Sequence, residues 1–87
     1  MSIIFDAAKN EKNIALRGLS FERVAEMDLL QALTLVDDRR DYGETRYRAF
    51  GQLDGCLHVV GYALRANDIR VVSLRRANKR EVKRYGR

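Results

Sequence analysis

A ten-residue apolar run, CLHVVGYALR, constrains the fold of this 87-residue chain more than any other stretch. It follows Asp54-Gly55, and an Asp-Gly pair between extended segments is a strong signal for a β-hairpin turn. A run that is apolar at nearly every position predicts a strand buried on both faces. We therefore expect residues 56–65 to form a central strand, hairpin-paired with the segment before it.

The neighbouring segments extend this hairpin into a meander. ALTLVDD predicts a short strand, AND predicts a turn, and IRVVSLRR predicts the last strand. ETRYRAFGQLD alternates, so its side chains should divide between two faces, with Thr45, Tyr47 and Ala49 on one and Arg46, Arg48 and Phe50 on the other. The same alternation in the last strand places Arg70 with Val72 and Leu74, opposite Val71, Ser73 and Arg75.

Helices are predicted at both ends of the chain. Residues 2–5 read as a short strand or extended segment, and Asp6 then caps a helix that ends at Gly18. Its expected inner stripe is Ala7, Ala8, Glu11, Ile14 and Ala15. Ser20 caps a second helix through about residue 29, with an expected inner side of Phe21, Val24, Ala25 and Leu29. Residues 77–85 predict a short final helix, with Ala77, Val82 and Tyr85 on its inner side.

The sequence thus predicts a single α+β domain over residues 1–87. It consists of two N-terminal helices, an antiparallel sheet of three to four strands and a C-terminal helix. The N-terminus has no apolar run of signal length, and no stretch has the length and hydropathy of a membrane span. We therefore expect a cytoplasmic protein with no membrane partner.

Positive charge is concentrated at one end of the chain. Residues 70–87 contain eight Lys or Arg and a single acid, Glu81, whereas the other 69 residues carry nine bases and eleven acids. The bases allow two interpretations, a solvated surface in loose ion pairs or a phosphate-binding surface. Because Tyr85 accompanies the bases of the final helix, the pattern suits RNA, whose bases stack on rings and guanidinium planes.

The inventory of reactive side chains is narrow. Cys56 is the only cysteine and His58 the only histidine, so neither an internal disulfide nor a zinc quartet can form. Cys56 and His58 would share a strand face, but no nearby carboxylate would orient the histidine for catalysis. An enzyme of this composition would work without metal or cofactor, and RNA cleavage fits. RNA supplies its own nucleophile, the 2′-OH, while Arg and Lys stabilise the charged intermediate.

Three segments, in order, resemble the BrnT family of toxins. FDAAKNEKNIALRGLSFERV is similar to the family's opening, ETRYRAFG to its Glu-x-Arg-x-x-x-x-Gly segment, and the closing strands carry its Arg-x-x-Ser-x-Arg-x-Ala signature and a terminal Tyr. The resemblance implies a RelE-like ribonuclease toxin of a bacterial type II toxin–antitoxin pair. It also implies a BrnA-like antitoxin partner and toxin in dimeric form within the complex.

The chain departs from the family at one motif. Leu16-Arg17-Gly18 stands where Lys-His-Gly is common, and Arg17 cannot exchange protons near neutral pH. The alternative function is therefore an attenuated homologue that acts as a nucleic-acid-binding or antitoxin-binding module. The expected catalytic set is Arg46, Arg48, Arg70, Arg75, Glu44 and Tyr85. The expected RNA contacts are Lys9, Arg17, Arg65, Arg76, Lys79, Arg80 and Lys83.

Overall fold

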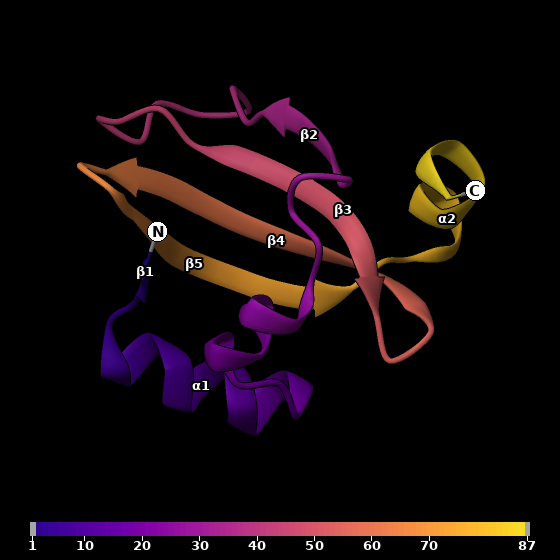
Figure 1. Cartoon of the computed structure of the whole chain (residues 1–87), viewed down its shortest axis with the longest axis horizontal. Coiled ribbons are helices and arrows are strands. Elements are labelled where there is room, and N and C mark those ends of the chain that lie inside the picture. Colours follow the sequence, from indigo (N-terminus) through magenta and orange to yellow (C-terminus); the bar gives the residue numbers. More distant parts are fainter. Residues whose placement is uncertain (1, 87) are drawn as a thin grey trace.

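The computed structural model describes residues 2–86. Its elements run in the order β1 (Ser2–Ile4), α1 (Ala7–Arg17), the 3₁₀ helix η1 (Phe21–Glu26), β2 (Leu33–Val36), β3 (Tyr47–Leu53), β4 (Cys56–Arg65), β5 (Asp68–Arg76) and α2 (Lys79–Tyr85) (Figure 1). The α+β class is confirmed. No helix in the described range is long and apolar enough to cross a membrane.

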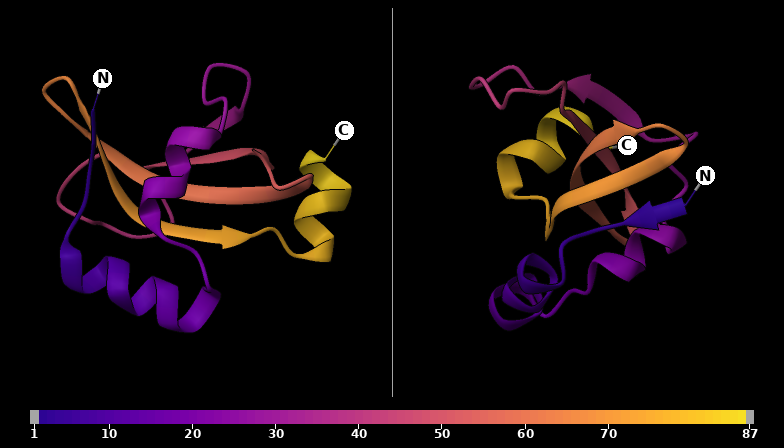
Figure 2. Two further views of the ribbon diagram at one scale, coloured as in Figure 1. Left: turned by 60° about the horizontal axis from the view of Figure 1, so that its bottom comes forward. Right: turned by 90° about the vertical axis from the view of Figure 1, so that its left-hand side faces the viewer.

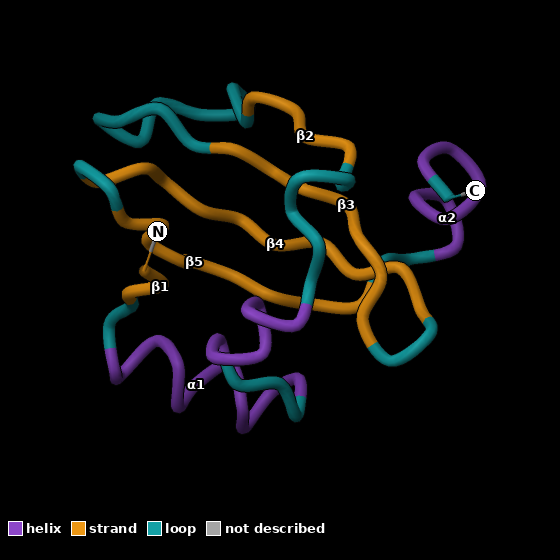
Figure 3. The backbone as a smooth tube through the Cα atoms, viewed as in Figure 1, coloured by secondary structure: helices purple, strands orange, loops and turns teal. Residues whose placement is uncertain are grey.

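One five-stranded sheet, in the order β1-β5-β4-β3-β2, organises the fold (Figure 3). The predicted central strand is confirmed, since β4 lies between β5 and β3 and is buried over most of its length. Leu53 pairs with Cys56 across the predicted hairpin. Both turn residues have positive φ, 54° at Asp54 and 77° at Gly55, which matches a tight two-residue turn and explains the Asp-Gly pair.

The sequence predicted an antiparallel sheet of three to four strands, whereas the sheet has five. β1 joins the sheet as a fifth strand, parallel to β5, so the sheet is mixed. Ser2, Ile3 and Ile4 pair with Asp68, Ile69 and Arg70. Parallel pairing between the two ends of a chain leaves no local turn signal, so the pattern predicted a short strand or extended segment here but not its partner.

The second predicted helix is a 3₁₀ helix that ends at Glu26 rather than near residue 29. A 3₁₀ helix has about three residues per turn, so positions three apart share a side. Phe21, Val24 and Met27 are accordingly buried. Ala25, which an α-helical stripe would turn inward, is exposed.

Helix α1 has the predicted bounds and caps but presents the opposite face to the sheet. The predicted inner stripe is exposed, and Ile14 is 44% accessible. The inner face carries amides: Asn13 Nδ2 donates to the carbonyls of Leu19 and Leu74, and Asn10 Oδ1 accepts from the backbone N–H of Phe21. Leu74 lies on β5 beyond the part paired with β1, so Asn13 covers an otherwise open sheet edge.

Hydrophobic side chains pack on both faces of the sheet. Figure 2 shows α1 and η1 lying together on one side of the sheet, away from α2. The larger core joins η1 to one face and includes Phe21, Val60, Val71 and Leu74. The smaller core lies on the other face, where the ring of Tyr85 from α2 packs 4.3 Å from Phe50. Tyr85 and Ala77 face inward as predicted, whereas Val82 is 47% exposed.

We predict that Asn13→Ala destabilises the fold more than Ile14→Ala, the reverse of the ranking that hydrophobicity alone gives. The first change leaves two carbonyls without their donor, at a cost of about 1–3 kcal/mol. The second removes a half-exposed side chain and should change stability by about 0.5 kcal/mol or less. Urea unfolding of both variants measures the difference, and equal midpoints would contradict it.

Candidate functional site

A β-bulge in β5 decides which arginines share a face. The register between β4 and β5 shifts after Gly61, which pairs with Ser73, while Tyr62 pairs with Val71. Val72 is therefore an extra residue, and Val71 and Leu74 both reach the larger core although they are three positions apart. The prediction that Arg70 and Arg75 lie on opposite faces is wrong because simple alternation misses this bulge.

Four arginines from three segments consequently lie on the sheet face opposite α1. We call this surface the arginine face and define it by Arg46, Arg48, Arg70 and Arg75. Their cross-strand partners fix the assignment: Arg48 pairs with Gly61, Arg70 with Ala63 and Arg75 with Val59, on the side of the smaller core. Arg46 lies just before β3, two residues from Arg48.

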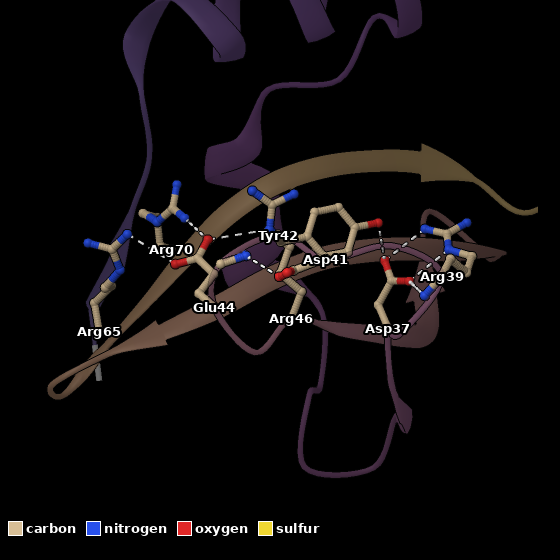
Figure 4. A network of polar contacts seen from close by, with 9 residues as sticks. Asp37, Arg39, Asp41, Tyr42, Glu44, Arg46, Arg65 and Arg70 are labelled. Carbon is tan, nitrogen blue, oxygen red and sulfur yellow. Dashed lines mark hydrogen bonds and ion pairs between the residues drawn. The ribbon is translucent and has the colours of Figure 1, made fainter.

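Glu44 contacts two arginines of the arginine face, Arg46 and Arg70, and also Arg65 at the end of β4 (Figure 4). Its carboxylate accepts from Arg65 Nη2 at 3.0 Å and from Arg46 Nε at 3.3 Å, and it is also paired with Arg70. Burial alone would raise the pKa of Glu44, but the hydrogen bonds from Arg65 and Arg46 and the charge of Arg70 lower it below its usual value. Glu44 is therefore an ionised hub for three guanidinium groups.

Arg75 is held by a second carboxylate. Glu81 Oε1 and Oε2 accept from the two Nη atoms of Arg75 at 2.7 and 2.9 Å. The same Glu81 completes a capping box with Asn78 at the start of α2. Hydrogen bonding from Arg75 lowers the pKa of Glu81 to about 2, so the pair stays ionised at neutral pH. The single acid of the basic tail thus both begins α2 and positions Arg75.

A hollow of about 220 Å³ opens beside this pair. Its polar lining combines residues of the arginine face with residues of the loop between β2 and β3, namely Arg46, Arg48, Ser73, Arg75, Asp37, Arg39 and Tyr42. The Nε of Arg48 and the Nε of Arg70 are buried and have no hydrogen-bond partner among residues 2–86. Buried guanidinium donors without partners favour an anion on this face.

The loop between β2 and β3 supplies a part of the site that the sequence reasoning missed. Asp37 accepts from Arg39 Nε and Nη2 at 2.7 and 2.8 Å and from the Tyr42 hydroxyl at 3.2 Å (Figure 4). The guanidinium of Arg46 lies 4.2 Å from the centre of the Tyr42 ring. A tyrosine inside an otherwise polar loop was the one available signal.

Comparisons with known proteins identify a family and a similar fold. Residues 5–81 match the family described as "Ribonuclease toxin, BrnT, of type II toxin-antitoxin system". Among solved structures, the crystal structure of the Brucella abortus ribonuclease toxin, BrnT, is 29% identical over 91% of this chain and 99% of that chain, with a TM-score of 0.73. A search of curated proteins gave no match.

The chain belongs to the BrnT ribonuclease toxin family.

Two of the BrnT segments identified in the sequence meet on the arginine face. Glu44 and Arg46 of the Glu-x-Arg segment contact Arg70 and Tyr42, and Arg70, Ser73 and Arg75 of the closing signature follow along β5. The opening segment does not reach this surface. It forms α1 and η1, which pack on the opposite side of the sheet.

Arg17, at the position where the BrnT family commonly has His, ends α1 and is exposed. Because α1 lies on the other side of the sheet, Arg17 is not placed beside Arg46 or Arg70 and cannot share one phosphate with them. Lys9 lies exposed on the same helix. Arg76 pairs with His58 and so points away from the arginine face, because cross-strand partners share a side.

The remaining expected RNA contacts flank the arginine face. Arg65 is tied to it through Glu44, and Lys79, Arg80 and Lys83 are exposed on α2. Tyr85 packs on Phe50, and the Arg48 guanidinium lies 5.9 Å from the same Phe50 ring. Tyr85 thus borders the arginine face but serves first as packing.

The Cys56-His58 pair is structural. His58 is buried, and its Nδ1 lies 2.9 Å from the Cys56 carbonyl oxygen, so the ring bonds to backbone rather than to the thiol. Among residues 2–86, no three His, Cys, Asp or Glu side chains gather as metal ligands would.

We predict an acid-labile fold. Hydrogen bonds from Arg39 hold the pKa of Asp37 well below its usual range, and Arg75 lowers that of Glu81 to about 2. Depressed folded-state pKa values stabilise the protein above the unfolded values near 4, and this stabilisation is lost as the pH falls from about 4 toward 2. Glu81→Gln should lower the stability by about 1.5–3 kcal/mol at pH 7, the scale for a hydrogen bond to a charged group, and by less at pH 2. Thermal unfolding between pH 7 and 2 measures this, and parallel curves for parent and variant would exclude it.

Proposed function

We propose that this chain is a metal-independent endoribonuclease whose active surface is the arginine face. The observation that supports the proposal is the convergence of four guanidinium groups on one sheet face, two of them with a buried Nε lacking a partner among residues 2–86. Membership of the BrnT family implies an RNA substrate and an antitoxin partner.

The chemistry follows from what such a surface can do. RNA cleavage by its own 2′-OH passes through a phosphorane with two negative charges, and fixed positive donors stabilise that charge more than they stabilise the single charge of the substrate. Arg48 and Arg70 offer buried donors, and Arg75 is fixed by Glu81. Guanidinium groups bind phosphate oxygens through two parallel hydrogen bonds, which also sets orientation.

Glu44 acts as a positioning residue in this proposal. Its carboxylate contacts three arginines and its pKa is lowered, so it is a weak base that stays ionised. The chain's one histidine, His58, pairs with Arg76 on the other side of the sheet. Cleavage would therefore depend on charge stabilisation rather than on an imidazole pair, and its rate should show no titration near pH 6.5.

We expect purified protein to cleave single-stranded RNA in the presence of EDTA and to leave 2′,3′-cyclic phosphate or its hydrolysed form. Arg70→Ala should lower the cleavage rate about a hundredfold or more, the scale for loss of one preorganised oxyanion donor. Arg17→Ala is the matched control, because it removes the same charge from the opposite face and should leave the rate unchanged.

Mass spectrometry identifies the cleavage products, and initial rates compare the parent with the two variants. Activity lost with EDTA and restored by Mg²⁺ would disprove metal independence. Equal rates for the parent and Arg70→Ala would remove the arginine face from the mechanism. RNA binding without cleavage would support the alternative function, an attenuated homologue that only binds. The presence of Arg17 where the family commonly has His favours that alternative.

We further propose that the antitoxin covers the arginine face with an acidic segment and that the complex contains a toxin dimer. β2 is an outer strand of the sheet and lies next to the loop that lines the hollow, so it offers an edge for an added strand. Arg48→Ala should weaken antitoxin binding by about tenfold, and Arg17→Ala should not. Titration calorimetry tests this, and an antitoxin that binds while cleavage continues at full rate would contradict it.

A further inference from the structure

We propose that Arg39 contacts the RNA backbone, completing with Arg48 and Arg75 a phosphate subsite in the hollow beside β5. This inference rests on the proposed function and extends it to a residue outside the motifs shared with the family. Arg39 lies in the loop between β2 and β3, which forms one wall of the hollow.

The first argument is how Arg39 is held. Asp37 is buried, with 8% of its surface exposed, and a buried carboxylate is costly unless it is paired and hydrogen-bonded. Its oxygens accept from the Nε, Nη2 and backbone N–H of Arg39 and from the Tyr42 hydroxyl. The Asp37 backbone N–H in turn donates to the Arg46 carbonyl at 2.7 Å. The loop, its buried acid and the Arg39 guanidinium are therefore joined in one hydrogen-bonded unit.

The second argument is what Arg39 leaves free. A guanidinium has five N–H donors, and Asp37 accepts from Nε and Nη2. The side chain is nevertheless 59% exposed, so the remaining donors are accessible. A side chain that is oriented before binding loses less conformational entropy when it binds, which is why fixed donors bind a ligand more tightly than mobile ones.

The third argument is the charge around the hollow. Four arginines and one aspartate line it, and the oxygens of that aspartate are already occupied. Hydrogen bonding to Glu81 raises the pKa of Arg75, and the nearby charge of Arg39 opposes that rise, so the two guanidinium groups repel each other across the hollow. Arg48 adds a buried Nε without a partner among residues 2–86. An anion would relieve the repulsion, and a backbone phosphate matches the forked donors of arginine.

Arg40 provides a control within the same loop. It is adjacent to Arg39, carries the same charge and lies 5.8 Å from the Tyr42 ring, but it does not line the hollow. Arg39→Ala and Arg40→Ala therefore change net charge equally and differ in whether the hollow loses a donor. Arg39→Lys and Arg40→Lys form a second matched pair, which keeps the charge but removes the forked set of guanidinium donors.

The probe is a fluorescein-labelled single-stranded oligonucleotide with 2′-O-methyl sugars, which cannot react, read by anisotropy at several NaCl concentrations. We expect Arg39→Ala to weaken binding about tenfold or more and to lower the slope of log affinity against log salt by about one. Arg40→Ala should weaken binding less than threefold. If Arg39→Ala fails to fold, as thermal unfolding would show, the lysine pair decides: Arg39→Lys should lose affinity several-fold, and Arg40→Lys should match the parent.

Arg75→Ala separates failure of this inference from failure of the proposed function. If Arg75→Ala loses cleavage while the Arg39 variants behave as their Arg40 counterparts, the inference alone is overturned. If Arg75→Ala also binds and cleaves as the parent does, the arginine face is not the active surface and the proposed function fails with it. An acidic peptide whose binding depends on Arg39 while oligonucleotide binding does not would assign the hollow to a protein partner and overturn the inference.

Discussion

The extra residue in β5 is the constraint on which the rest of the surface depends. Without the shift at Val72, Leu74 and Val71 could not both reach the larger core, and Arg70 and Arg75 would lie on opposite faces. Gly61 lies beside the bulge, where a Cβ would come within 2.5 Å of Ser73 Oγ, so a larger residue would force Ser73 to rotate. One inserted residue therefore satisfies the core on one side of the sheet and gathers the arginines on the other.

Placing several arginines on one face is unfavourable because their charges repel. Three carboxylates offset this repulsion, each in a different role. Glu44 joins arginines from two strands and a loop, Glu81 links the sheet to α2, and Asp37 fixes a loop. All three have lowered pKa values because arginine donors surround them. They neutralise part of the charge and orient the guanidinium groups, while leaving donors on Arg48 and Arg39 available.

The sequence predicted the parts of the fold that local chemistry determines. The Asp54-Gly55 turn, the buried strand after it and the caps of α1 at Asp6 and Gly18 follow from short-range patterns, and all are present. What the pattern missed depends on distant partners. Asn10 and Asn13 face inward because they form hydrogen bonds with the start of η1 and the exposed edge of β5. Hydrophobic periodicity records only where apolar residues lie, so it cannot predict such contacts.

The candidate site divides in the same way. Arg46, Arg48, Arg70 and Arg75 could be named from sequence, but their common face depends on the bulge, which has no sequence signal of its own. Asp37 and Arg39 lie in a loop with many charged residues. The sequence of such a loop does not distinguish a buried ion pair from a solvated one. Burial distinguishes them, and burial is a property of the fold.

The basic end of the chain is two structures rather than one tail. Arg70 and Arg75 belong to β5 and are fixed by carboxylates, whereas Lys79, Arg80 and Lys83 project from α2 and are exposed. Glu81 connects the two parts, since the carboxylate that caps α2 also clamps Arg75. Folding of the last helix is thereby coupled to the geometry of the arginine face. The exposed bases add attraction that acts at a distance and is screened by salt, while the fixed arginines supply the short-range contacts that determine where a phosphate lies.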